Sequence, residues 1–220
     1  LVADERRPSL TREVQPWSLF VSDCRSSCVI FFKEHRSKWH GWATERMMNG
    51  VAVSSKKLAD LFGLKMWRCW TDIEAPPLEV LSSIIFERSC WDSEVIRWKV
   101  LNQINDCCDI VQYVVNDIPP HPTRDCSVIR YSSCIITSTS VNPNYSSLIG
   151  GIKVPWIEAW YFIEPTGGGR SRISYISRMD LRGRSKSWYN KYYGCHCAIH
   201  MRNIKSHFRQ LFSRGPETTI

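Results

Sequence analysis

The spacing of hydrophobic positions divides the chain into a helical beginning, a strand-rich middle and a helical end. Ser22 and Asp23 offer an N-cap, and apolar residues then recur at helical spacing up to about Met48. Asn49–Gly50 is a stop signal, so the pattern predicts a helix over residues 24–48. The apolar face of that helix comprises Cys24, Cys28, Phe31, His35, Trp39 and Trp42.

Three further helices are predicted. Pro76 and Pro77 suit the first turn of a helix that extends to Arg88, and a short, turn-rich helix follows at residues 90–98. The longest helix covers residues 185–212. Its predicted apolar face comprises Tyr192, Cys195, Ile199, Ile204, Phe208 and Leu211.

The middle of the chain alternates in hydrophobicity with the period of β-strands. Strands are predicted at residues 51–53, 65–75, 98–104, 110–116, 126–133, 134–141, 152–163 and 170–179. Strands grouped in series favour an α+β fold with an antiparallel sheet over a Rossmann-type fold. A curved sheet around a long amphipathic helix encloses either packed core or a cavity.

The length of 220 residues suits one sizeable domain or at most two small ones, and 43% hydrophobic and 12% aromatic residues can fill a core. No run of 18 apolar residues is present. We expect residues 1–20 to be a linker after an upstream domain, and residues 21–220 to form the domain itself. The ten cysteines have irregular spacing and no secretion signal precedes them, so we expect reduced, mostly buried thiols in a cytoplasmic protein.

The net charge of +8 is concentrated near the end of the chain. Residues 170–214 carry eleven Lys or Arg and a single acid, Asp180, a net charge of +10. Such a segment favours an anionic partner, either a membrane surface or an acidic protein. A solvated helix face explains the helical part equally well. Nucleic acid is disfavoured because no recognition motif or aromatic ladder accompanies the charge.

The stretch Glu164–Arg172, "EPTGGGRSR", resembles a phosphate-binding loop. It lacks the Lys-Ser pair of a P-loop, and Arg172 stands where the dinucleotide fingerprint needs its third glycine. Both motifs precede a helix, whereas the residues that follow here alternate as in a strand. The pattern therefore predicts a β-hairpin with a glycine turn.

The other candidate sites in the sequence are weak. Cys195, His196, Cys197 and His200 share one helix, but Cys-x-Cys on a helix directs its thiols to different sides, which disfavours a metal site. No nucleophile motif of a hydrolase is present, so we predict no catalytic residue. Arg130 lies on the same strand face as Cys126 and Val128. If that face is interior, its guanidinium needs a partner or a ligand; an edge position is the alternative.

Several motifs, in this order, resemble the START (StAR-related lipid transfer) domain family. They are "HPTRDCSVIR", "LIGGIK", "YFIEPTGGGRSRISYISRMDLRGRSKSWYNKYYG" and "GPETTI", and they are most similar to START domains of the deleted-in-liver-cancer type of Rho GTPase-activating protein. The resemblance implies a helix-grip fold, in which a curved antiparallel sheet wraps around the C-terminal helix and encloses a tunnel for one lipid. It also implies a catalytic GTPase-activating domain upstream, outside residues 21–220.

The resemblance further implies that Arg130 lies in the tunnel and pairs with an acid on the neighbouring strand. Near the acid's place we find Gln112 and Tyr113, with Asp117 close to the turn, so Tyr113 or a lipid headgroup is the alternative partner. The strand register over residues 132–146 is not fixed by the resemblance. The predicted lipid-binding residues are Val111, Tyr113, Val115, Val128, Arg130, Trp160 and Tyr175.

The resulting hypothesis is a lipid-binding module, without a cofactor other than a bound lipid, that regulates or localises Rho signalling at membranes or focal adhesions. Its expected partners are a lipid, an anionic membrane surface and proteins of Rho signalling or adhesion. The alternative is a non-catalytic platform for protein or membrane binding, in which large side chains fill the tunnel.

Overall fold

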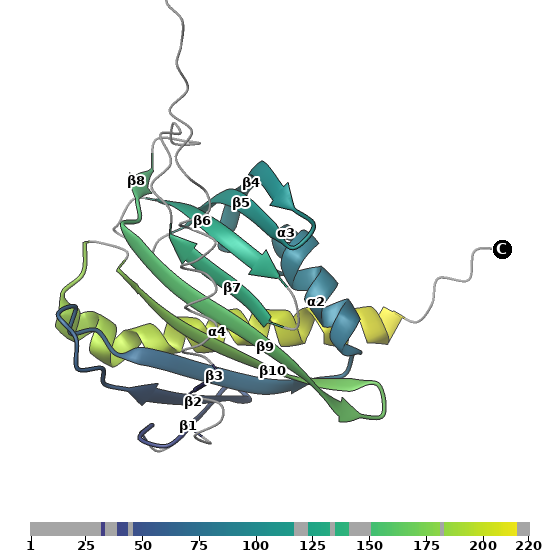
Figure 1. Ribbon diagram of the computed structural model, residues 1–220. Helices are drawn as coiled ribbons and strands as arrows, with labels where there is room; N and C mark the ends of the chain where they lie inside the picture. Colours follow the sequence, from purple (N-terminus) through teal and green to yellow (C-terminus); the bar gives the residue numbers. More distant parts are fainter. Residues whose placement is uncertain are drawn as a thin grey trace, which may run out of the picture.

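The computed structural model describes residues 32–33, 39–43, 46–116, 123–132, 135–140, 151–180 and 183–214. Figure 1 shows a long, strongly curved sheet that wraps around the C-terminal helix α4 (Lys186–Arg214). Two shorter helices, α2 (Pro77–Phe86) and α3 (Arg88–Trp91), connect the two halves of the sheet. The strands are β1 (Arg46–Met48), β2 (Val51–Lys56), β3 (Met66–Ile73), β4 (Val95–Asn105), β5 (Cys108–Val115), β6 (Arg124–Ser132), β7 (Ile135–Ser140), β8 (Ile152–Lys153), β9 (Trp156–Gly167) and β10 (Arg170–Asp180).

The sheet order is β1-β2-β3-β10-β9-β7-β6-β5-β4, with every neighbouring pair antiparallel and short β8 added in parallel to β6. The predicted α+β, helix-grip architecture is confirmed. The pairing of β3 with β10 joins the first and last parts of the sheet, because Cys69 lies opposite Tyr175. Both residues are buried beneath α4 in the main core.

The glycine stretch forms the hairpin between β9 and β10, as predicted. Gly167, Gly168 and Gly169 have φ angles of +87°, +60° and +71°, a region that side chains disfavour. Arg172, which follows, forms an ion pair with Asp72 on β3 and lies over the ring of Trp70 at 4.4 Å. The stretch is therefore a structural turn whose second arginine is already engaged.

Helix α4 approaches β3 closely because of one glycine. A Cβ atom on Gly194 would lie 2.3 Å from Cε3 of Trp67, far inside van der Waals contact. This contact fixes the rotation of α4 about its axis. The residues it buries are Tyr189, Tyr193, Cys197, Met201, Ile204 and Phe208.

Two of our predictions are wrong in these regions. The first half of α4 does not bury the predicted face: Tyr192 is 45% exposed, and Leu211 at the other end is 48% exposed. The helix predicted to reach Met48 ends earlier, because residues 46–48 pair with β2 and Asn49–Gly50 is a hairpin turn with positive φ at both residues.

Most of the first predicted helix, residues 24–31 and 34–38, lies outside the described residues. The same holds for residues 133–134 and 141–146 within the uncertain register of 132–146. Within the described part, β7 pairs antiparallel with both β6 and β9. None of the helices in this part is both long and apolar enough to cross a membrane.

Candidate functional site: a cavity beneath the C-terminal helix

A cavity of about 330 Å³ lies between the first half of α4, the α3–β4 segment and strands β5, β6 and β10. This volume is within the range of pockets that hold small organic ligands, about 300–1,000 Å³. Its lining is mainly apolar on the side of α4 and β10 and carries charged groups on the side of α3 and, at Arg124, on β6. The lining residues are Arg88, Asp92, Glu94, Tyr113, Val115, Asn116, Arg124, Cys126, Tyr175, Met179, Trp188, Tyr193, His196, Cys197 and His200.

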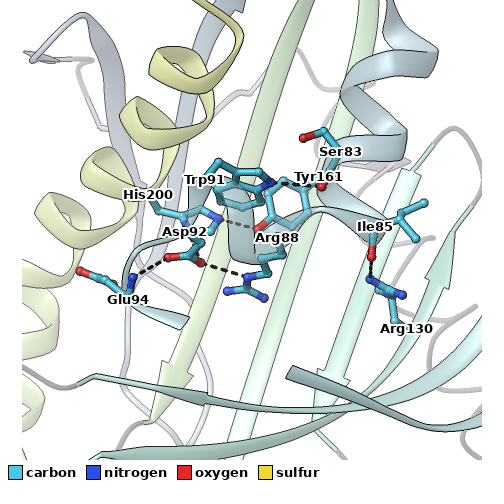
Figure 2. A network of polar contacts seen from close by, with 9 residues as sticks. All are labelled: Ser83, Ile85, Arg88, Trp91, Asp92, Glu94, Arg130, Tyr161 and His200. Carbon is cyan, nitrogen blue, oxygen red and sulfur yellow. Dashed lines mark hydrogen bonds and ion pairs between the residues drawn. The ribbon is translucent and has the colours of Figure 1, made fainter. Parts of the chain in front are cut away.

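The charged side is organised around Asp92, whose side chain is 3% exposed (Figure 2). Its Oδ2 accepts a hydrogen bond of 3.0 Å from Nε of Arg88, one turn earlier. The same oxygen lies 3.5 Å from Nδ1 of His200 on α4. Its Oδ1 accepts a hydrogen bond of 3.3 Å from the backbone N–H of Glu94.

His200 links this carboxylate to the sheet. Its Nε2 lies 2.5 Å from the hydroxyl oxygen of Tyr161 on β9. Burial raises the pKa of Tyr161 above its ordinary range, so the phenol keeps its proton and can donate it to Nε2. With that assignment, Nε2 is the acceptor and Nδ1 carries the proton that points toward Asp92. Trp91 packs edge-on against His200 and donates its indole N–H to the carbonyl of Ser83 at 3.1 Å.

The neighbours of Asp92 keep it ionised. Burial by itself would raise the pKa of Asp92, but the contact with His200 and the charge of Arg88 more than offset it, and the pKa lies well below its usual range. A buried carboxylate that is compensated in this way orients its partners. The arrangement therefore fixes Arg88 at the border of the cavity.

Arg88 is the cation best placed to meet a ligand. Its guanidinium lies over the ring of Tyr113 at 4.5 Å and over that of Trp98 at 5.7 Å. The bond to Asp92 uses Nε, so the Nη1–Nη2 edge can reach another acceptor, and the Tyr113 hydroxyl lies close to this guanidinium. The side chain is 18% exposed, so that edge is within reach of a molecule in the cavity.

Arg130 is differently placed. It is opposite Asp109 in the pairing of β5 with β6, and its Nε donates to Asp109 Oδ1 at 3.0 Å. Its Nη1 donates to the carbonyl oxygen of Ile85 at 2.8 Å (Figure 2). The space beside it is a separate cavity of about 20 Å³, enough for about one water molecule. The guanidinium is thus satisfied by the protein.

Comparison with known proteins identifies the architecture around this cavity. Residues 27–213 match the START domain family. The chain belongs to that family. It is 37% identical over 195 residues to StAR-related lipid transfer protein 13 of Mus musculus, covering 86% of this chain and 18% of that protein. It is 33% identical over 196 residues to Rho GTPase-activating protein 7 of Bos taurus, covering 86% of this chain and 17% of that protein.

Solved structures agree with this assignment. The human StarD13 (DLC2) lipid transfer and protein localization domain superimposes with a TM-score of 0.73 at 34% identity, over 82% of this chain and 95% of that chain. Human StAR-related lipid transfer protein 5 gives 0.75 at 17% identity, over 89% of this chain and 99% of that chain, which supports the fold alone. The chain spans less than a fifth of the length of the two relatives above.

In the structure, the predicted lipid-binding residues lie in three different places. Tyr113, Val115 and Tyr175 line the main cavity. Val111, Val128 and Arg130 line the small cavity instead, together with Tyr113. Trp160 packs on the opposite face of the sheet with Met66 and Ile176, so the prediction that it lines the tunnel is wrong. Its strand neighbours Ala159 and Tyr161 face the interior.

Arg88 and Asp92 were not predicted as site residues, and His200 was considered only as a metal ligand. The spacing of Arg88 and Asp92, four residues apart in "ERSCWD", was a usable signal for an ion pair on one helical turn. The acid that pairs with Arg130 was also missed. It is Asp109, the first residue of the "DIVQYVVND" stretch, and neither Gln112 nor Tyr113 takes that place.

The suspected metal residues have other roles in the START domain. His200 belongs to the Asp92 cluster, and Cys197 lies in the main core. Within the described ranges, no group of three or more His, Cys, Asp or Glu side chains could hold a metal ion. The seven cysteines in those ranges are free thiols.

Proposed function

We propose that this START domain is a lipid-binding module that holds one lipid in the cavity beneath α4, by sequestration rather than by reaction. The observation that carries the proposal is the cavity itself, about 330 Å³, apolar along α4 and charged at Arg88. The apolar part of a ligand would be held by burial, about 25 cal/mol per Å². Relatives that are named for lipid transfer support the same proposal.

The polar end of the lipid would lie at Arg88. Arg130, the arginine that the family resemblance singled out, is already bonded to Asp109 and Ile85. Arg88 instead offers a rigid guanidinium edge beside the cavity, suited to a phosphate or carboxylate oxygen. The volume is at the lower end of the range for ligand pockets, which favours a ligand of which a small apolar part is enclosed.

The test is native mass spectrometry of the purified chain, which should show a co-purifying lipid. Arg88→Met combined with Asp92→Asn removes the Arg88 cation without leaving a buried unpaired charge, and leaves Arg124 in place. We expect loss of anionic lipids from the bound population. The matched control is Arg130→Met with Asp109→Asn, which removes the other buried pair and should leave occupancy and headgroup preference unchanged. An Arg88 variant with wild-type lipid content would contradict the assignment of the polar end.

The filled-tunnel alternative makes a different prediction. It requires an enclosed space well below the several hundred Å³ of a ligand pocket, and the volume here favours the lipid-binding hypothesis over it. Val115→Trp, which places a large ring at the cavity wall, should abolish lipid occupancy if the cavity is the site. Unchanged occupancy in this variant would mean that the lipid binds elsewhere.

The role in Rho signalling concerns a longer protein than this chain. Since a relative is named a Rho GTPase-activating protein, we propose that the module localises or regulates such an activity at membranes or adhesions in the cytoplasm. Imaging of the full-length protein with and without Val115→Trp would test this. Identical localisation and identical cellular levels of active Rho would contradict it.

A further inference from the structure

The connection between β2 and β3, here called the 57–65 loop, presents two large apolar side chains to solvent. Leu61 is 99% exposed and Phe62 is 51% exposed. Single exposed hydrophobic residues are common on protein surfaces and need no explanation. This pair differs because of the structure that holds it and the charges around it.

The backbone of the loop is tied down at both sides of Leu61. Asp60 Oδ1 accepts hydrogen bonds from the backbone N–H groups of Phe62 and Gly63, at 3.1 and 3.2 Å. The side chain of Asn190 on α4 donates to the carbonyl of Gly63 at 3.0 Å and accepts from the N–H of Lys65 at 2.7 Å. The exposed tip is thus anchored to the first turns of the C-terminal helix.

The side chain of Phe62 packs on the ring of Trp156 and the guanidinium of Arg178. Phe62 lies parallel to Trp156 with 4.8 Å between ring centroids. Arg178 lies over both rings, at 4.7 Å from Trp156 and 5.3 Å from Phe62, and forms an ion pair with Asp60. An apolar tip that is already ordered loses little conformational entropy when it docks.

The surroundings of the tip are basic. Lys57 is exposed, Lys65 is half-buried, and Nζ of exposed Lys186 lies 3.8 Å from the Cβ position of Gly63. Asp60 is compensated by Arg178. Two further acids lie on the neighbouring strands. Burial raises the pKa of Glu158 although Arg178 opposes this, and Asp180 lies opposite Trp156 in the β9–β10 pairing. Exposed apolar side chains ringed by lysines complement an anionic lipid surface.

We propose that the 57–65 loop docks the domain on an anionic membrane, with Leu61 and Phe62 at the boundary between headgroups and acyl chains and the lysines at the phosphates. Trp188, in the same turns of α4 as Lys186 and Asn190, lines the lipid cavity. Docking through this loop therefore brings the cavity wall next to the bilayer. The inference rests on the membrane part of the proposed function and names the surface that carries it.

The experiment is sedimentation of the chain with vesicles of phosphatidylcholine, with and without phosphatidylglycerol. We expect binding only to vesicles that contain phosphatidylglycerol, weakened by added salt. Leu61→Ser should reduce the partition coefficient about tenfold, and Lys57→Gln and Lys186→Gln about fivefold each. Leu61→Trp should bind at least as well as the wild type, since tryptophan favours the interface.

The matched control is Leu78→Ser on α2, because Leu78 is 77% exposed but lies outside the loop. It should bind like the wild type. The proposal is overturned if Leu61→Ser binds like the wild type, if Leu78→Ser loses as much binding, or if vesicles of pure phosphatidylcholine bind equally well. Failure of the wild type to bind either vesicle also overturns it, and the patch would then fit a protein partner.

Native mass spectrometry separates this inference from the proposed function. Leu61→Ser should retain the co-purifying lipid of the wild type while it loses vesicle binding. Loss of vesicle docking with retained lipid supports the division of roles. Loss of lipid from this variant would contradict it, because Leu61 does not line the cavity.

Discussion

Helix α4 has two contact surfaces of opposite character. Toward β3 it packs without a gap, because Gly194 lets the helix backbone meet the ring of Trp67. Toward α3 and β5 it is separated from the sheet by the cavity, and its contacts there include the polar link from His200 to Asp92 and the ring of Trp91. One helix therefore serves both as core and as a wall of the cavity.

The difference assigns stability and binding to different residues. Close apolar packing fixes the helix position, as in any protein interior. The opposite surface uses directional contacts, Arg88–Asp92 and Tyr161–His200, which hold polar groups in place around a space without filling it. Changes to each surface should consequently have distinguishable effects.

The largest expected loss of stability follows from removal of the Asp92 carboxylate, which is the centre of the polar contacts between α3 and α4. Asp92→Ala leaves Arg88 without its carboxylate, and removal of one partner from a buried ion pair typically costs about 3–5 kcal/mol. Because Arg88 is 18% exposed to the cavity, we expect a loss of about 2–4 kcal/mol in the free energy of unfolding, measured by urea denaturation. The control, Asp92→Asn with Arg88→Met, should lose distinctly less.

The packing of α4 on β3 should be most sensitive to a substitution at Gly194. Gly194→Ala improves helix propensity by about 1 kcal/mol but forces a methyl group into Trp67, and overpacking costs about 1–3 kcal/mol. Because 2.3 Å is far inside van der Waals contact, we expect the upper end of this cost and a net loss of up to about 2 kcal/mol by the same measurement. Trp67→Leu added to Gly194→Ala should cost less than the sum of the single changes, because it makes room. Simple additivity would refute the steric explanation.

Acid should act on the polar surface selectively. The pKa of Asp92 is depressed in the folded state, so its stabilisation is complete above the ordinary carboxyl pKa, near 4, and is lost as the pH falls toward the depressed value. Asp92→Asn should flatten the decline of stability below about pH 4. Burial raises the pKa of Glu158, so its ionised form lowers the stability of the folded state, the opposite of the effect of Asp92. Glu158→Gln should therefore raise the stability at neutral pH.

The smallest effect is expected at the sheet surface, away from both surfaces of α4. Arg172 pairs with Asp72, but the two side chains are 40% and 51% exposed. Exposed ion pairs contribute about 0.2–1 kcal/mol, so Arg172→Ala should cost less than about 1 kcal/mol and less in high salt. A loss as large as that of Gly194→Ala would show that the hairpin has a further role.

The strand-rich part of the fold was predictable because alternation and turn residues are local signals. The glycine hairpin is an example, since three glycines between two alternating segments have one simple explanation. Which face of α4 is buried was not predictable. Two faces of the helix, one with Tyr192 and Ile199 and one with Tyr193 and Cys197, have similar apolar spacing. The contact of Gly194 with Trp67, 127 residues earlier, decides between them.

The candidate site was predictable only in part, for a similar reason. The strand alternation placed Tyr113, Val115 and Tyr175 correctly on an inward face. It gave no information on the cross-strand partner of Arg130, because the register that brings Asp109 opposite depends on the β5–β6 pairing. Arg88, Asp92 and His200 come from α3 and α4, and only the closed fold brings these two helices together.

The pairing of β3 with β10 also sets the order in which the molecule can be made. Thr71 lies opposite Ile173, about one hundred residues later in the chain, so closing this pair carries a large loop entropy and is expected to be slow. During synthesis the edge of β3 that pairs with β10 stays unpaired until β10 has left the ribosome. Helix α4 is translated only after β10. The cavity therefore forms last among the described elements, and the lipid proposed for it could enter only after α4 has been translated.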